Sequence, residues 1–170
     1  RTSVRRSINH FSMAYEKAHK LHIVSVVAVI RNNEGKILLL KRSEREAAYP
    51  GKFTFPGGKI EDNDTVEETL RKETAEEAGL TLKPEKVLLK DKSYIRPDGQ
   101  TVKVFSYLCT VEDASRVTIS DDFTEYRWVG ADELPTLQHV GVEGEFIKVA
   151  ELEDKELLAG FQTQSVKVGG

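Results

Sequence analysis

The sequence predicts a mixed α/β fold in which a β-sheet is flanked by helices. Three features support this: an apolar, β-rich run at residues 22–30, a strand pair around a turn at 97–99, and helical apolar spacing over 144–158. Hairpins interleaved with helices are typical of a sheet packed against helices. A chain of 170 residues is long enough for one domain with its own core.

The first two strands are predicted to form a hairpin. Residues 22–30 are almost continuously apolar, as in a central strand that is buried on both faces. The turn-forming run at 32–35 then returns the chain as a second strand over 36–41. A loop is expected over residues 43–51.

A helix is predicted from about Thr65 to the residue before Gly79. Thr65 can cap its first turn, and Glu68 stands where the partner in a capping box belongs. Asn63 tolerates the left-handed conformation that a turn before the helix would need. Gly79 ends the helix, because glycine readily adopts the left-handed conformation common just beyond the last turn.

The later elements are three strands and a second helix. Residues 87–95 and 101–111 are predicted strands joined through the turn at 97–99, and residues 126–129 form a shorter strand. Apolar residues then recur near the helical period over 144–158.

The ends of the chain differ from its middle in composition. In residues 1–20 basic side chains outnumber the single acid, which indicates a terminal arm, with a helix as one option, rather than a transit peptide. Residues 160–170 are rich in Gln, Ser and Gly and are expected to form a flexible tail. The domain itself is placed at residues 21–159.

Composition narrows the class of protein. The net charge is −3 and the charges are interspersed, so no broad basic face for nucleic acid is expected. No apolar run is long enough to span a membrane. The single cysteine, Cys109, has apolar neighbours and fits a buried strand thiol in a reducing cytoplasm. We therefore expect a cytoplasmic enzyme domain that binds neither nucleic acid nor membrane.

An acidic cluster closes the first predicted helix. At ~100° per residue, Glu73 and Glu77 project nearly along the line of Val66 and Leu70, and Glu76 lies about 60° to one side. Like charges packed in this way repel and favour a cation, and Mg²⁺ prefers oxygen ligands. A solvated acidic helix end is the alternative.

A glycine-containing loop is predicted before this helix. Residues 53–61 run from aromatic side chains into Pro56, Gly57 and Gly58. Adjacent glycines permit positive φ and a close approach to a ligand or metal. A glycine loop that leads into a carboxylate-rich helix indicates a metal-phosphate site.

Together these segments resemble the signature of the Nudix hydrolase family, and residues 55–61 are similar to its MutT-like branch. That signature comprises a glycine, a glutamate, an Arg-Glu pair, a Glu-Glu pair and a closing glycine at set spacing. Its positions fall here on Gly58, Asp64, Lys72, Glu73, Thr74, Glu76, Glu77, Gly79 and Leu80. Three of them depart from the family, which has Glu for Asp64, Arg for Lys72 and an apolar residue for Thr74.

The resemblance covers roughly residues 22–158 and implies the Nudix α/β/α sandwich with a mixed β-sheet. Residues 29–38 resemble the hairpin that opens this fold, and residues 128–135 resemble its late strand and the following turn. Many family members pair, so a homodimer stays open.

The resemblance also implies a catalytic centre. Glu73, Glu76 and Glu77 would hold Mg²⁺, with Mn²⁺ as an alternative, and the Gly57 carbonyl would be a further ligand. Glu73 or Glu76 could act as general base. Lys72 replaces an arginine that holds a catalytic glutamate through forked hydrogen bonds, and a lysine cannot reproduce that fork. We therefore expect weaker catalysis than an arginine would support.

Some family members take the base from a distant loop instead. Asp121, Asp122 and Glu125 are the candidates for that loop here, and a solvated acidic turn is the alternative for each. Both sources of the base stay open.

Substrate contacts are expected from three residues near the signature. Arg42 resembles an arginine that contacts substrate in MutT-like members, although a surface arginine at a strand end is equally consistent. Gly58 and Lys59 belong to the expected phosphate-binding segment. MutT reads oxidised guanine with a C-terminal asparagine, and this chain has none after Asn63, which weakens that substrate assignment.

Residues that could recognise a base are less clearly marked. Tyr94, Arg96 and Phe105 could stack on it, although aromatic strand residues more often belong to the core. Gln138 or His139 could take the place of the missing asparagine.

The function implied by the resemblance is a Mg²⁺-dependent pyrophosphohydrolase. Water would attack a phosphoanhydride of a nucleoside triphosphate or another nucleoside diphosphate derivative, and a triphosphate would yield the monophosphate and pyrophosphate. The alternative is a non-catalytic module that binds a nucleotide or ADP-ribose, which Lys72 favours and the three retained glutamates oppose. In both cases the partner is a nucleotide-type small molecule.

Overall fold

The structure is a computed structural model that describes residues 21–152. Its elements, in chain order, are β1 (Ile23–Ile30), β2 (Ile37–Arg42), β3 (Phe53–Thr54), β4 (Gly57–Lys59), α2 (Val66–Ala78), β5 (Leu82–Ile95), β6 (Thr101–Val111), β7 (Phe123–Val129), a short 3-10 helix η1 (Leu134–Thr136) and α3 (Glu143–Glu151). The predicted arm at 1–20, the tail at 160–170 and the end of the last predicted helix lie outside the described residues.

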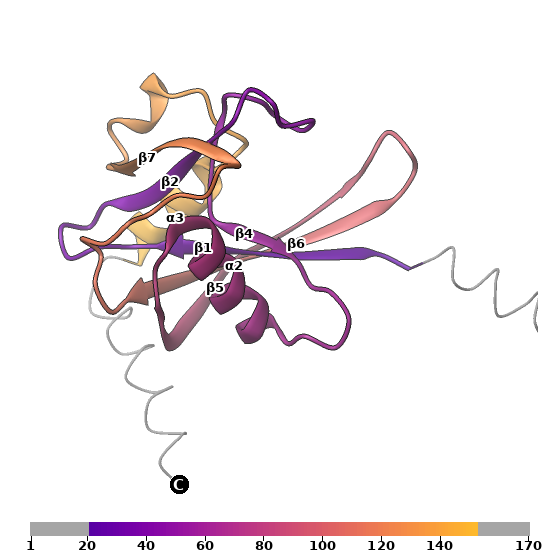
Figure 1. Cartoon of the computed structure of the whole chain (residues 1–170), viewed down its shortest axis with the longest axis horizontal. Coiled ribbons are helices and arrows are strands. Elements are labelled where there is room, and N and C mark those ends of the chain that lie inside the picture. The colour runs from indigo at the N-terminus through magenta and orange to yellow at the C-terminus, as the bar shows by residue number, and fades with distance from the viewer. Residues whose placement is uncertain (1–20, 153–170) are drawn as a thin grey trace, which may run out of the picture.

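The strands form two sheets (Figure 1). The larger has the order β4-β1-β6-β5, and it is mixed, because β1 runs parallel to β6 and antiparallel to β4. The smaller has the order β3-β2-β7 and is antiparallel. As predicted, β1 is a central strand.

The predicted hairpin between the first two strands is wrong. The turn is present, with the Gly35 N–H donating to the Asn32 carbonyl, but β1 and β2 lie in different sheets. An isolated bridge from Arg31, just after β1, to Ile37 and a hydrogen bond from the Asn32 N–H to the Lys36 carbonyl link the two segments. β6 pairs with one edge of β1 along its whole length, and β4 occupies part of the other edge, at Ser25–Val27. β2 therefore pairs with β3 and β7 instead.

Two helices pack against opposite sides of β1, which confirms the predicted layering. Successive side chains of a strand point to opposite faces. Val26 and Ile30 pack in one core cluster with Leu70 of α2, whereas Val29 packs in the other with Phe146 of α3. The α/β/α arrangement thus follows from the apolar run that makes up β1.

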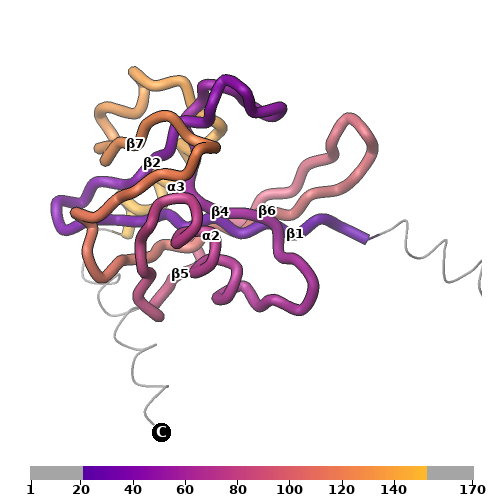
Figure 2. The backbone as a smooth tube through the Cα atoms, in the orientation of Figure 1, coloured from indigo at the N-terminus to yellow at the C-terminus, as the bar shows by residue number. Residues whose placement is uncertain are grey.

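The strand pair around 97–99 is also confirmed, and its tip extends away from the body of the domain (Figure 2). β5 begins at Leu82 rather than at residue 87, because register irregularities near Pro84 let pairing continue past a residue without an N–H donor. β7 begins at Phe123 rather than at residue 126, because buried Phe123 already pairs with Arg42 of β2.

The termini of α2 follow the sequence closely. The Thr65 hydroxyl accepts from the Glu68 N–H while the Glu68 carboxylate accepts from the Thr65 N–H, as a capping box requires. Gly79 ends the helix with φ of 65°. The left-handed residue before the helix is Asp62, with φ of 48°, and not Asn63.

Two predictions from composition can be examined in the part of the chain that is described. No helix in residues 21–152 is long and apolar enough to cross a membrane. Cys109 is buried on β6, and burial raises the pKa of its thiol to about 12. It is a core thiol and not a nucleophile.

Candidate active site

The signature glycines form a short strand, β4, which is antiparallel to β1, where a loop was predicted. Neither glycine has positive φ, so the reason for glycine here is close approach alone. A Cβ on Gly58 would lie 2.6 Å from the carboxyl carbon of Glu73, and one on Gly57 would meet the backbone of β1 at Val26. Glycine is therefore needed at both positions, because α2 and β1 pack tightly against β4.

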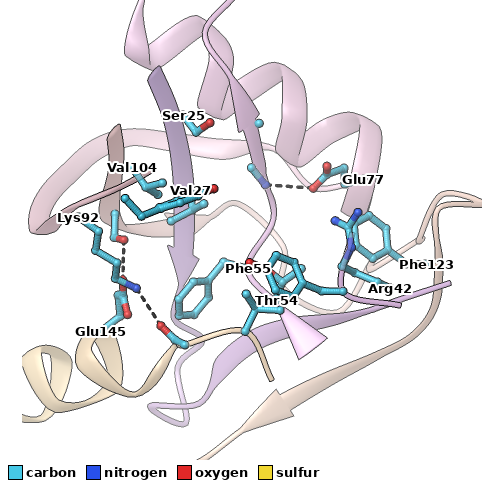
Figure 3. A pocket seen from close by; sticks show the side chains of 17 residues that line it. Ser25, Val27, Arg42, Thr54, Phe55, Glu77, Lys92, Val104, Phe123 and Glu145 are labelled. Atoms are coloured by element: carbon cyan, nitrogen blue, oxygen red, sulfur yellow. Dashed lines mark hydrogen bonds and ion pairs between the residues drawn. The ribbon is translucent and has the colours of Figure 1, made fainter. Parts of the chain in front are cut away.

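A direct hydrogen bond joins this strand to the helix. The Gly57 N–H donates to Glu77 Oε2 at 3.0 Å (Figure 3). Glu77 thereby presents its carboxylate to a cavity of about 420 Å³ that Gly57, Gly58 and Arg42 also line. Helix, strand and arginine, separated along the chain, thus meet at one space, whereas Glu73 and Glu76 do not line it.

Arg42 is positioned by the loop that follows β2. Its Nε donates to the Ala48 carbonyl at 2.6 Å, and its Nη2 pairs with Glu46 at 3.0 Å. Its positive charge also lowers the pKa of Glu77, so the two groups lie within electrostatic reach. Lys59, in contrast, is exposed and does not line the cavity.

The carboxylates of α2 carry charge that the described protein groups do not balance. The pKa of Glu77 is raised to about 8, chiefly by burial; Glu73 and Asp122 add to this rise, and the hydrogen bond from Gly57 and the charge of Arg42 oppose it. Burial, followed by repulsion from Glu76, raises the pKa of Glu73. None of the ion pairs formed within residues 21–152 includes these three glutamates.

This donor set fits a hard divalent cation. Carboxylates that raise one another's pKa gain most from a positive charge placed between them. No group of three or more His, Cys, Asp or Glu side chains is gathered for a metal ion in the described part of the chain. Mg²⁺ does not require such a group, because it is usually held by one or two carboxylates with waters and substrate phosphates. Glu73 and Glu77 suit that mode, with Glu76 exposed beside them.

Lys72 lies on the exposed side of α2 and makes no ion pair with any residue of 21–152. Its charge nevertheless lowers the pKa of Glu73, so it acts on that carboxylate through space without holding it. This is the behaviour expected of a lysine in place of a forked guanidinium.

The three candidates for a loop base separate in the structure. Asp121 and Asp122 are both exposed, and of the two it is Asp122 whose charge raises the pKa of Glu77. Glu125 is not in a loop, because it belongs to β7 and pairs with Lys41 and Arg127. Of the three, Asp122 is the one that the fold brings to the glutamates of α2.

The sequence interpretation missed the polar end of the cavity. Lys92 of β5, Ser106 of β6 and Glu145 of α3 line it together, and Ser106 and Glu145 are fully buried. Helical spacing gave one signal, since Glu145 lies one turn before apolar Val149 and thus on the buried face. Nothing local in the sequence indicated that Lys92 would meet it.

Of the residues considered for base recognition, only Tyr94 lines the cavity. Phe105 packs against a core cluster and Arg96 pairs with Asp98 in the hairpin turn. Gln138 and His139 are held by backbone pairing with Phe53 and do not line the cavity. The missing asparagine therefore has no replacement there.

Comparison with known proteins gives a consistent result. A NUDIX domain model matches residues 21–149. The nucleoside triphosphatase NudI of Klebsiella pneumoniae (strain 342) is 32% identical over 123 residues, which cover 65% of this chain and 84% of that protein. The crystal structure of the MutT protein from Methanosarcina mazei Go1 superposes with a TM-score of 0.65 at 28% identity, over 80% of this chain and 97% of that one. The NUDIX domain of Shewanella oneidensis NrtR, solved in complex with ADP ribose, gives a TM-score of 0.63 over 79% of this chain and 90% of that one, and its 19% identity indicates a shared fold alone.

Proposed function

The chain belongs to the Nudix hydrolase family, and on that premise we propose that it is a Mg²⁺-dependent pyrophosphohydrolase of nucleoside triphosphates. Its products would be the nucleoside monophosphate and pyrophosphate. The observation that carries the proposal is the partly buried carboxylate of Glu77, which accepts a hydrogen bond from the Gly57 N–H and shares a cavity with Arg42. The relative whose match covers 84% of its own length is named a nucleoside triphosphatase, which supports this substrate class.

The proposed metal site consists of Glu73, Glu76 and Glu77, with the Gly57 carbonyl as a further ligand. When bound there, Mg²⁺ would neutralise phosphate charge and lower the pKa of a water molecule. Burial already raises the pKa of Glu73 and Glu77, and no protein cation within the described residues offsets them by an ion pair.

The remaining steps fall to side chains around these carboxylates. Arg42 would attract the triphosphate, and Gly57 and Gly58 line the same end of the cavity. Glu73 would take the proton of the attacking water, because a carboxylate with a raised pKa is a better base near neutral pH. Asp122 is the alternative base, since its charge reaches the same site.

A panel of nucleoside triphosphates and nucleoside diphosphate derivatives tests the proposal. Each compound is incubated with the protein and Mg²⁺, with a chelator-treated sample as control, and both the nucleotide product and pyrophosphate are quantified. We expect metal-dependent release of a monophosphate and pyrophosphate from at least one triphosphate. Tight binding of one compound, such as ADP-ribose, with hydrolysis of none would instead establish the non-catalytic binding module.

A further inference from the structure

The end of the cavity away from Glu77 holds a buried polar cluster made of Lys92, Ser106 and Glu145. The Ser106 hydroxyl donates to Glu145 Oε1 at 2.8 Å, and the Lys92 ammonium pairs with the same oxygen. In Figure 3, Lys92 and Glu145 lie on the side of the cavity opposite Arg42 and Glu77. One continuous space thus has two polar ends of different character.

The geometry leaves Lys92 one donor to spare. A lysine ammonium has three N–H groups. One faces Glu145, and a second donates to the Gly141 carbonyl at 2.8 Å. The side chain is 33% exposed and lines the cavity, so the third can reach a bound molecule.

The charge of Lys92 is balanced before any ligand arrives. Glu145 is fully buried and supplies the opposing charge, and its second oxygen, Oε2, is buried without a hydrogen-bond partner. A neutral ammonium-carboxylate pair attracts a phosphate far less than a lone cation does. This end therefore suits an uncharged group with a hydrogen-bond acceptor.

The walls beside Lys92 suit a flat ring. Tyr94, two residues further along β5, lines the cavity with 48% of its surface exposed. Val27, Val104 and Phe55 complete an apolar surface between the two polar ends (Figure 3). Aromatic and apolar side chains with a few placed polar groups are typical of sites for ring-bearing ligands.

Building on the proposed function, we infer that this end is the nucleobase subsite and that Lys92 selects bases with a carbonyl oxygen. The spare N–H of Lys92 would donate to that oxygen, as in uracil, thymine or guanine. Adenine carries an amino group where guanine carries its carbonyl oxygen, so in the same orientation its amino group and the Lys92 ammonium would be two donors facing each other. Glu145 acts as a positioning residue, because it holds the ammonium in place from within the core.

The test compares KM for uridine triphosphate and adenosine triphosphate in the wild type and in Lys92→Met, both with Mg²⁺. We expect the wild type to prefer the uridine compound. In the variant, KM for that compound rises about 10-fold, as for the loss of a hydrogen bond to a charged group, and kcat changes little. KM for the adenosine compound stays nearly constant, so the preference between the two collapses.

Matched variants separate recognition from folding. Lys90→Met changes a lysine two residues away on β5 that does not line the cavity, and it should leave the KM ratio unchanged. Because Lys92→Met leaves a buried carboxylate unpaired, the double variant with Glu145→Gln is measured as well, and it should show the same loss of preference. Glu145→Gln alone should reduce the KM ratio while kcat is kept.

The inference fails if Lys92→Met and the double variant hydrolyse both nucleotides with the wild-type KM ratio. It also fails if the wild type prefers the adenosine compound. Failure of the proposed function would look different, because the wild type would then hydrolyse neither. In that case calorimetry with non-hydrolysable analogues of the two triphosphates makes the same comparison through Kd, and an unchanged Kd ratio in Lys92→Met would overturn the inference.

Discussion

The two ends of the cavity hold a partly buried carboxylate, Glu77, and a fully buried one, Glu145, in opposite electrostatic states. At one end Glu77 is crowded by Glu73 and Asp122, and a hydrogen bond from Gly57 is its main support. At the other end Glu145 is more deeply buried, and its Oε1 pairs with Lys92 and accepts from Ser106, while Oε2 has no hydrogen-bond partner among the described residues.

A buried charge is costly unless it is paired, so the two ends cannot serve the same purpose. The end with the neutral Lys92–Glu145 pair can bind an uncharged part of a ligand by hydrogen bonding. The end whose carboxylates form no ion pair within the described residues is stabilised either by protonation, which the raised pKa of Glu77 favours, or by a cation from outside the chain. The contrast therefore supports the two proposals made above, that metal and phosphates bind at one end and that the other end selects the base.

The largest expected effect is on turnover at the unbalanced end. Glu77→Gln should lower kcat with Mg²⁺ by roughly 100-fold or more, because the loss of several kcal/mol of charge stabilisation costs a factor of ten for each ~1.4 kcal/mol. Glu76→Gln should also remove most of the activity, while the fold, followed by circular dichroism, persists in both.

Glu67→Gln on the same helix is the control, since Glu67 makes only an exposed ion pair with Lys86 and should keep full activity. Wild-type turnover in both Glu76→Gln and Glu77→Gln would end the assignment of the site.

A smaller loss is expected from Gly58→Ala. Its methyl group would lie 2.6 Å from the carboxyl carbon of Glu73, whose flexible side chain can move aside. We expect activity to fall by about 10-fold, as for a displaced supporting group, with little change in Tm. Gly57→Ala is the contrasting variant, because it would press on the backbone of β1 and lower the free energy of unfolding by about 1–3 kcal/mol. Equal losses of stability in the two variants would show that Glu73 is not the group displaced.

Lys72→Arg should raise kcat by a few-fold, through its effect on the carboxylates of α2. A guanidinium can hold a carboxylate through two parallel hydrogen bonds, which the ammonium of Lys72 does not do in the described structure. We expect kcat to rise, measured under saturating nucleotide and Mg²⁺, whereas Arg71→Lys next to it has no effect. No gain in turnover would refute the view that Lys72 limits catalysis.

The smallest expected effect is the pH dependence of the stability of the metal-free protein. The pKa of Glu77 in the fold is about 8 against an ordinary 4.5, so the folded state favours the protonated acid. Its contribution to stability is present below pH 4.5 and is lost as the pH rises towards 8. Since each pKa unit corresponds to about 1.4 kcal/mol, even part of this shift is measurable.

Glu77→Gln removes that dependence. In chelator, the variant should match the wild type in Tm near pH 4.5 and exceed it by several degrees near pH 8.5. A difference in Tm that is the same at both pH values would contradict this account.

Features that depend on residues close in the sequence were predicted better than features that depend on the pairing of distant strands. The capping box of Thr65 with Glu68 and the left-handed Gly79 involve residues a few positions apart, and both are confirmed. The sheet to which β2 belongs depends on which strand edges are free after folding, and the local turn at 32–35 does not encode that.

The site divides in the same way. The registration of Gly58 with Glu73 and Glu77 belongs to one continuous motif, so it was visible in the sequence. Lys92 and Glu145 are separated by much of the chain and meet only because α3 packs beside β5. A glutamate on the apolar face of a helix indicates burial, but its partner is decided by tertiary packing.

Calorimetric titration of Mg²⁺ into the nucleotide-free protein near pH 8.5, where Glu77 is ionised, tests the contrast between the two ends most directly. We predict measurable binding by the wild type, at least about 10-fold weaker binding by Glu77→Gln, and unchanged binding by Lys92→Met. Equal Mg²⁺ affinity in the wild type and Glu77→Gln would contradict the assignment of the unbalanced carboxylates to a metal.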